Sequence, residues 1–104
     1  MQPLEKNIEK KVCDYAKERG LLVYKFTSPA RAAVPDRLFI VPHVGVFFIE
    51  FKRPGVKATA PQLREHGRLR DVGIRVYVVD DIAYGKNVID YETKLIVHAK
   101  ENKT

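Results

Sequence analysis

The amino-acid sequence predicts an α/β domain in which helices pack on a mixed sheet. Apolar residues recur at helical spacing near the N-terminus, and short apolar runs bounded by turn signals follow in the middle of the chain. A second helical segment separates the last two of these runs, which allows them to lie parallel. With 104 residues, 45% of them hydrophobic, residues 1–104 are expected to form one domain with a modest core.

The first half of the chain opens on an amphipathic helix. Residues 4–19 form this predicted helix, and Gly20 offers a left-handed stop. LLVYKF (21–26) predicts a strand, and TSPARAAVP (27–35), with its small residues and two prolines, predicts an exposed loop. The apolar positions of the helix are Leu4, Ile8, Val12, Tyr15 and Ala16.

The remaining elements complete the order αβββαβα. RLFIV (37–41) and VFFIEFK (46–52), joined by a PHVG turn, predict an antiparallel hairpin. A helix follows from Pro61 to a stop at Gly73, and IRVYVV (74–79) predicts the fourth strand. A final helix is expected over about residues 87–100. Apolar positions of these two helices are Leu63, Leu69, Val72, Val88, Ile89, Leu95, Ile96 and Ala99.

The charge distribution favours a polyanionic partner. The net charge is +6 and the isoelectric point is about 9.6. Residues 52–75 hold seven basic against two acidic residues, giving +5, and residues 17–37 add +3. The basic charge is therefore concentrated in the middle of the chain.

The same composition excludes several classes of protein. Cys13 is the only cysteine, so no intrachain disulfide can form, and a buried free thiol in a reducing cytosol is expected. The charged N-terminal residues do not fit a signal peptide, and no apolar run approaches the length of a membrane span. We expect a soluble cytoplasmic protein of a bacterial or phage-infected cell, without membrane association or a small-molecule organic cofactor.

The segment VFFIEFK carries the clearest chemical signal. Side chains alternate along a strand, so Glu50 and Lys52 share one face while the apolar residues between and before them point to the other. An acid and a base on an otherwise apolar strand cost free energy unless something uses or satisfies them. The hairpin folds Asp36 back toward Glu50. Two neighbouring carboxylates repel, and a divalent cation is a common reason for keeping both ionised.

Each of these residues also has a structural interpretation. Glu50 and Lys52 could form a cross-strand pair on a solvated face. Asp36 could simply begin a strand, and Glu9 could be a solvated helix position among neighbouring lysines.

Gln62 and the histidines have structural interpretations as well. Thr59-Ala60-Pro61-Gln62 fits a capping box, in which Gln62 reaches back to a free amide at the helix start. The three histidines lack metal-ligand spacing and are expected to be structural or surface residues: His43, His66 and His98.

Together these features resemble the PD-(D/E)xK nuclease superfamily, and more narrowly its VRR-NUC branch, as found in small stand-alone phage and prophage proteins. The similarity covers roughly residues 8–81. One departure is Ala33, where such proteins usually have glycine before Val-Pro-Asp. The resemblance implies a restriction-endonuclease-like αβββαβ core, followed here by a C-terminal helix. The matching segments are IEKKVCDYAKERGLLVYKFTSPARAAVPDRLFIV, VFFIEFKRPG and APQLREHGRLRDVGIRVYVVD.

The resemblance also implies a metal site. By the family pattern, Asp36 and Glu50 coordinate Mg²⁺ or Mn²⁺ with the backbone carbonyl of Phe51. Glu9 matches the glutamate of the family's first helix and would complete the acidic cluster.

Further roles follow from the same pattern. Lys52 would orient or deprotonate the attacking water, and Gln62 matches the family's site glutamine. The implied catalytic residues are thus Asp36, Glu50, Lys52, Gln62 and Glu9. The candidates for phosphate contacts, which position nucleic acid without reading its sequence, are Lys25, Ser28, Arg31, Arg53, Lys57 and Arg64.

The resulting expectation is a metal-dependent, structure-selective DNA endonuclease that hydrolyses phosphodiester bonds. Small stand-alone members of the branch resemble four-way-junction (Holliday-junction) resolvases, which suggests a homodimer, because paired cuts need two sites related by two-fold symmetry. Flaps, nicks and linear duplexes remain alternative substrates. A non-catalytic basic DNA-binding module would explain the charge but not the Glu-x-Lys pair. An RNA-binding domain would need aromatic residues on an exposed sheet face.

Overall fold

The computed structural model of the chain describes residues 4–101, with side chains described for residues 4–94. The order αβββαβα predicted from the sequence is confirmed, and so is the α/β class. The elements are α1 (Glu5–Glu18), β1 (Leu22–Lys25), β2 (Arg37–Val41), β3 (Gly45–Phe51), α2 (Ala60–Asp71), β4 (Arg75–Val79) and α3 (Ile82–Glu101).

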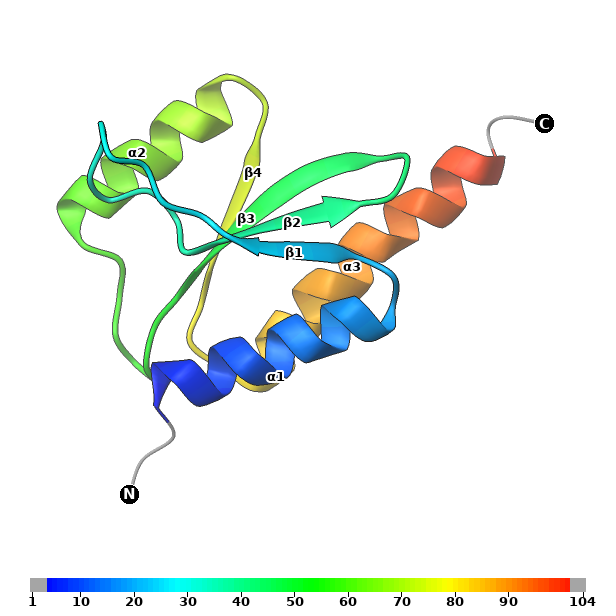
Figure 1. Cartoon of the computed structure of the whole chain (residues 1–104), viewed down its shortest axis with the longest axis horizontal. Helices are drawn as coiled ribbons and strands as arrows, with labels where there is room; N and C mark the ends of the chain where they lie inside the picture. Colours follow the sequence, from blue (N-terminus) through cyan, green and yellow to red (C-terminus); the bar gives the residue numbers. More distant parts are fainter. Residues whose placement is uncertain (1–3, 102–104) are drawn as a thin grey trace.

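The four strands form one mixed sheet in the order β1-β2-β3-β4. β1, β2 and β3 pair antiparallel, whereas β4 lies parallel to β3, as the helical crossover predicts. In this register Glu50 is paired with Val78 and Phe51 with Val79. The end of β3 runs toward the first turn of α1 (Figure 1).

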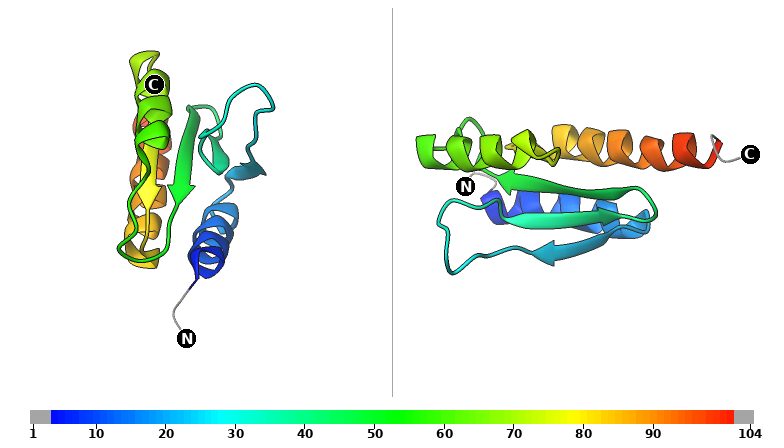
Figure 2. Two further views of the ribbon diagram at one scale, coloured as in Figure 1. Left: turned by 90° about the vertical axis from the view of Figure 1, so that its left-hand side faces the viewer. Right: turned by 90° about the horizontal axis from the view of Figure 1, so that it is seen from above.

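The helices divide between the two faces of the sheet (Figures 1 and 2). α1 and α3 lie side by side on one face, and α2 lies on the other, near β4. Phe47, Ile49 and Phe51 point toward α1 and α3 and are fully buried, as the strand alternation predicts. Glu50 and Lys52 therefore belong to the α2 face.

α1 and α3 approach each other closely at a glycine. A Cβ atom added to Gly85 of α3 would lie 2.4 Å from Cγ2 of Val12, closer than any real contact. The free thiol of Cys13, the next residue in α1, is also buried, and burial raises its pKa to about 11. The glycine that ends α1, Gly20, has φ +88°, as its predicted role as a stop requires.

α2 buries polar rather than apolar side chains. Its predicted apolar positions Leu63 and Val72 are 53% and 76% exposed, whereas Glu65 and His66 are buried. The helix packs near β4 and places Gln62 and His66 against Glu50 of β3. His66, expected from the sequence to be a structural or surface residue, is fully buried.

α3 begins five residues earlier than the predicted start at residue 87. Asp81 accepts a hydrogen bond from the backbone N–H of Tyr84 at 2.8 Å and so satisfies a free amide at the helix start. The prediction placed this start too late, because boundaries inferred from apolar periodicity are uncertain by several residues. His98 and the apolar residues Leu95, Ile96 and Ala99 lie outside the described side chains. Within the described chain no helix is both long and apolar enough to cross a membrane.

Candidate functional site

The carboxylates of Asp36 and Glu50 meet where β2 begins and β3 ends. The antiparallel register pairs Arg37 with Ile49, so one step further along the ladder Asp36 lies across from Glu50. The Oδ2 atom of Asp36 accepts a hydrogen bond from the backbone N–H of Phe51 at 2.8 Å. This bond fixes the Asp36 carboxylate beside the end of β3, as the hairpin predicts.

Glu50 is a buried acid in a poorly compensated environment. It is 2% exposed, and its Oε1 atom is without a hydrogen-bond partner within the described residues. Burial, followed by the nearby negative charge of Asp36, raises the pKa of Glu50 to about 8. A nearby cation would favour the ionised form of such a carboxyl group, because it would compensate the buried negative charge.

Lys52 supplies only part of that positive charge. Its Nζ atom is 3.9 Å from Oε2 of Glu50, at the outer limit of an ion pair and beyond hydrogen-bond distance. The lysine side chain is 14% exposed, so its ammonium group lies at the border of the buried site. The solvated-face interpretation of Glu50 and Lys52 is therefore wrong: both side chains are largely shielded from water.

Gln62 both completes the capping box of α2 and contacts Glu50, the two roles that were alternatives in the sequence analysis. The side-chain Oε1 of Gln62 accepts a hydrogen bond from the backbone N–H of Thr59 at 2.9 Å. The backbone N–H of Gln62 donates to the Thr59 hydroxyl at 3.3 Å, which completes the capping box. Its Nε2 donates to Oε2 of Glu50 at 3.1 Å. The cap thus holds the glutamine side chain in place against the carboxylate.

Two glutamates of α1 lie near this end of the sheet, and they differ in their contacts. Glu9 forms a short ion pair with Arg37, so its carboxylate is already satisfied by the protein. Glu5, one turn earlier, has a pKa raised by burial and by the charge of Asp36, and it contributes in turn to raising the pKa of Glu50. Sequence reasoning chose Glu9 and missed Glu5, which fits the same helix face.

An open pocket of about 470 Å³ leads to Asp36. Glu5 and Glu9 line one side of it, and Lys25 and Ser28, two of the predicted phosphate contacts, line another. Acidic and basic groups therefore share one pocket, as a site that holds both a cation and a phosphate requires.

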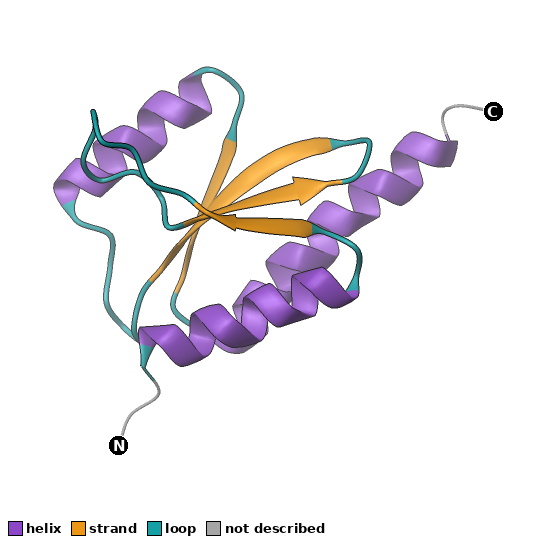
Figure 3. Ribbon diagram, viewed as in Figure 1, coloured by secondary structure: helices purple, strands orange, loops and turns teal. Residues whose placement is uncertain are grey.

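The other predicted phosphate contacts spread from this pocket along the α2 side. The long loop between β1 and β2 extends beside α2 (Figure 3), where Arg31 pairs with the buried Glu65 at 3.1 Å. Arg68 shares the same carboxylate at 3.4 Å. Three further residues, Arg53, Lys57 and Arg64, are exposed.

His66 is the polar group that sequence reasoning left aside. It is fully buried, and its Nε2 atom is 3.8 Å from Oε1 of Glu50. Burial, with help from the charge of Arg70, lowers its pKa. The available signal was its spacing of four residues from Gln62, which places both side chains on one face of a helix.

The residues present fit a hard divalent cation in their chemistry. Two carboxylates meet, one carboxylate oxygen is buried without a partner within the described residues, and oxygen ligands are what Mg²⁺ and Mn²⁺ prefer. No preformed group of three or more His, Cys, Asp or Glu side chains suited to a metal is found within the described part of the chain. The backbone and water would have to complete the ligand set.

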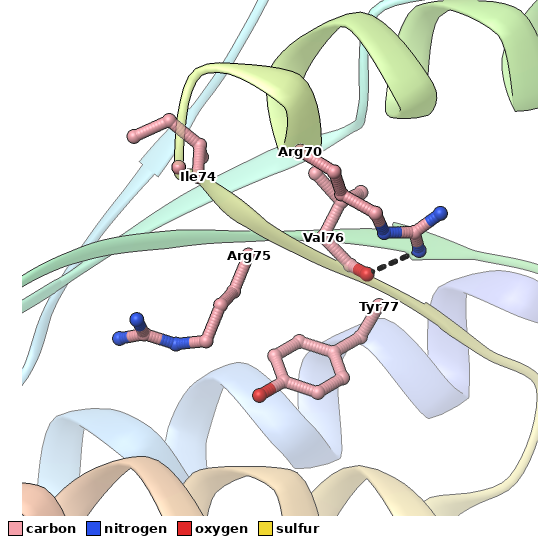
Figure 4. A pocket seen from close by; sticks show the side chains of 6 residues that line it. Arg70, Ile74, Arg75, Val76 and Tyr77 are labelled. Carbon is pink, nitrogen blue, oxygen red and sulfur yellow. Dashed lines mark hydrogen bonds between the residues drawn. The ribbon is translucent and has the colours of Figure 1, made fainter.

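A second pocket, of about 390 Å³, lies at the other end of β4 (Figure 4). Arg70 donates to the backbone carbonyl of Val76 at 2.6 Å, and the side chains of Arg75 and Tyr77 point toward α3. The predicted catalytic and metal-binding residues do not line it. Two of its polar side chains, Arg75 and Tyr77, donate hydrogen bonds to Glu92 of α3 instead.

The fold and the Asp36–Glu50–Lys52 arrangement define a restriction-endonuclease-like α/β domain. A solved structure described as "VRR_NUC domain" matches with a TM-score of 0.67 and 38% sequence identity, over 80% of this chain and 95% of that chain. The chain is also 46% identical over 76 residues to "Putative nuclease p44" of Acyrthosiphon pisum secondary endosymbiont phage 1, covering 73% of this chain and 82% of that protein. No protein-family model matches. The chain belongs to the VRR-NUC family.

Proposed function

We propose that residues 1–104 act as a single metal-dependent DNA endonuclease domain that hydrolyses phosphodiester bonds and prefers four-way junctions. The observation that carries the proposal is the state of Glu50. Its carboxylate is buried next to that of Asp36, with one oxygen free of hydrogen bonds within the described residues. A carboxylate so placed is costly unless it binds a cation. The nuclease name of the phage relative supports the same reading.

Asp36, Glu50, the backbone carbonyl of Phe51 and a glutamate of α1 would hold Mg²⁺ or Mn²⁺. We keep Glu9 in this set from the family pattern and add Glu5, because Arg37 already neutralises Glu9. When bound, the cation would lower the pKa of an attacking water and stabilise negative charge on the phosphate.

The protein's own groups position the reactants. Lys52, at the border of the buried site, would orient the attacking water and offset charge on the phosphate. Gln62 keeps Glu50 in place through its 3.1 Å hydrogen bond.

The DNA backbone would approach across the open pocket. Lys25 and Ser28 line it beside Asp36, and Arg31, held by Glu65, extends the basic surface along α2. Such contacts release counterions from DNA, so affinity should fall steeply with salt. The remaining phosphate contacts that we propose are Arg53, Lys57 and Arg64.

We infer a homodimer because one chain provides one site, whereas resolving a junction needs two symmetric cuts. Tyr84 and Tyr91 of α3 support an interface there: they are seven residues apart, which is two helical turns, and are 45% and 55% exposed. Light scattering at micromolar concentration should give twice the chain mass of 11.9 kDa. A monomer mass in the presence and absence of junction DNA would contradict this inference.

The test of the activity is a cleavage assay on four-way junctions, flaps, nicked and linear duplexes, with Mg²⁺, with Mn²⁺ or with chelator. We expect metal-dependent cleavage that is fastest on the junction. Asp36→Asn and Lys52→Ala should abolish cleavage while DNA binding persists. Asp14→Asn is the matched control, because Asp14 is an exposed α1 residue paired only with Lys10 within the described chain. Wild-type rates in both site variants would exclude the assigned site.

A further inference from the structure

Three buried side-chain atoms lack a hydrogen-bond partner within the described part of the chain, and all three belong to two neighbouring residues. They are Oε1 of Glu50 and both ring nitrogens of His66. Buried polar atoms are nearly always paired in folded proteins, so a cluster of three requires a reason. The Nε2 and Oε1 atoms that face each other are 3.8 Å apart.

The spacing of 3.8 Å identifies what can pair these atoms. A bridging water makes two hydrogen bonds at a roughly tetrahedral angle, which places the bridged atoms about 4.5 Å apart. A direct N–H···O bond needs about 3 Å. A shift of less than about 1 Å, well within the torsional freedom of an imidazole ring, closes the contact. The two groups are thus placed to bond each other directly.

α2 presents two donors to the two oxygens of the same carboxylate. Gln62 and His66 are four residues apart and so lie on one face of the helix. Gln62 already donates to Oε2 at 3.1 Å, and its own position is fixed by the capping box with Thr59. His66, fully buried, faces Oε1. The hydrogen bond from Gln62 to Oε2 is therefore formed, whereas His66 and Oε1 are slightly too far apart to form the second one.

We propose that His66 is a positioning residue that donates its Nε2–H to Oε1 of Glu50 and fixes the plane of that carboxylate for the cation. This inference rests on the proposed function, because it assigns Glu50 to cation binding. A carboxylate oxygen has two lone pairs, so Oε1 can accept from His66 and still face a metal ion. Hydrogen bonds of this kind orient metal-ligating carboxylates and are worth about 10- to 100-fold in metal affinity or activity.

The first test reads the proton itself and needs neither metal nor DNA. Long-range ¹H–¹⁵N spectra of the metal-free protein, labelled in histidine and recorded above pH 8 so that Glu50 is ionised, report which ring nitrogen carries a proton. We expect a protonated Nε2 in His66, with the signal assigned by its loss in His66→Phe and compared with the exposed His43. An unprotonated Nε2 would overturn the proposal, since the histidine would then accept from Glu50 or bond elsewhere.

The second test uses side chains that match one ring nitrogen at a time. Glutamine places an amide N–H near the position of Nε2, and asparagine places one near Nδ1. We expect His66→Phe and His66→Asn to lower kcat or Mg²⁺ affinity by about 10- to 100-fold, and His66→Gln to recover most of the loss. Melting temperatures of the three variants separate this effect from loss of folding.

The outcomes distinguish this inference from the proposed function. Equal activity of His66→Gln and His66→Asn would overturn the role of His66 while leaving the nuclease proposal intact. If His66→Phe does not fold, the comparison of these two variants still tests the role of His66. A wild-type protein that cleaves no DNA under any metal condition would refute the proposed function, and with it the role assigned here, even if the spectra showed a protonated Nε2.

Discussion

Two of the most deeply buried carboxylates, Glu92 on one face of the sheet and Glu50 on the other, have opposite environments. On the α1 and α3 side, Glu92 is completely buried and fully paired: Arg75 donates to it twice, at 2.6 and 2.7 Å, and the Tyr77 hydroxyl donates at 2.6 Å. On the α2 side, Glu50 receives one hydrogen bond, from Gln62, and is 3.9 Å from Lys52.

Under the proposed function, this difference separates a structural acid, Glu92, from a cation-binding one, Glu50. The chain can satisfy a buried carboxylate completely, as it does with Arg75 and Tyr77 around Glu92. It leaves Glu50 incomplete although Lys52 and His66 are both within 4 Å. A carboxylate that lacks hydrogen-bond partners can still bind a ligand, whereas one whose oxygens are all paired within the protein can only stabilise the packing.

The largest expected effect is the loss of catalysis in Glu50→Gln. We expect the cleavage rate to fall by at least about 100-fold, the scale lost when a directly interacting catalytic group is removed. Stability should stay the same or rise, because the carboxyl of Glu50 must take up a proton when the metal-free chain folds at neutral pH, whereas glutamine needs none. Single-turnover cleavage and thermal melting measure the two quantities. A marked loss of stability with cleavage retained would reverse the assignment of the two glutamates.

The reciprocal variant, Glu92→Gln, should lose stability instead. Breaking one partner of a buried ion pair costs about 3–5 kcal/mol, and because Arg75 is 40% exposed we expect a smaller loss, about 2–3 kcal/mol. Urea unfolding measures this change. Cleavage per folded molecule should remain near wild type, and Tyr77→Phe should show the same pattern with a smaller loss, about 1 kcal/mol.

The raised pKa of Glu50 predicts how the metal-free protein responds to pH. The folded carboxyl keeps its proton up to about pH 8, whereas in the unfolded chain it loses the proton near the ordinary value of 4.5. The folded state therefore binds more protons between these values, and its stability falls as pH rises through this range.

The clearest window lies between pH 6.5 and 8, above the ordinary pKa of histidine. There the slope is at most about 1.4 kcal/mol per pH unit. Urea unfolding at several pH values measures it. Glu50→Gln should remove the slope, and saturating Mg²⁺ should flatten it. An unchanged slope in Glu50→Gln would show that another group titrates.

Much of this architecture could be predicted because local pattern and tertiary packing agree. The alternation of side chains along β3 predicted that its aromatic residues would be buried on one face and that Glu50 and Lys52 would share the other. The Pro-Asp segment and the turn at Gly45 correctly paired Asp36 with the end of β3. In β3 the two-residue repeat of apolar residues in the sequence matches the two-residue alternation of side chains along a strand.

The remaining features depend on contacts between distant residues. Glu5 and Glu9 occupy equivalent helix positions, and only the docking of α1 on β2 pairs Glu9 with Arg37. The burial of His66 follows from its position against Glu50 of β3, which no helical periodicity reports. The need for glycine at Gly85 comes from its contact with Val12, far away in the sequence.

The two faces also differ in how closely their helices pack, and a pair of helix glycines sharpens this contrast. Gly85→Ala should destabilise the protein by about 1–3 kcal/mol, because the new Cβ would overlap Val12 on the α1 side. Gly67→Ala in α2 is the matched control: nothing lies within 4 Å of its Cβ position, so stability should rise by about 0.5–1 kcal/mol. Thermal melting of both variants compares them. A neutral Gly85→Ala would contradict close packing of α1 and α3.

The smallest expected effect concerns the loop on the α2 side, where Ala33 has φ +67°. This left-handed conformation costs a residue with a Cβ atom about 1–2 kcal/mol, and glycine adopts it freely but loses more entropy on folding. The glycine that related proteins usually carry here should therefore be slightly better: Ala33→Gly should raise stability by up to about 1 kcal/mol, read as a higher melting temperature. Because Ala33 lines the pocket that leads to Asp36, the variant also tests whether loop strain serves the site. We expect unchanged cleavage, since the hydrogen bond from Phe51 holds Asp36 independently of the loop. A gain in stability joined to a loss of cleavage would instead assign the strained alanine a part in substrate positioning.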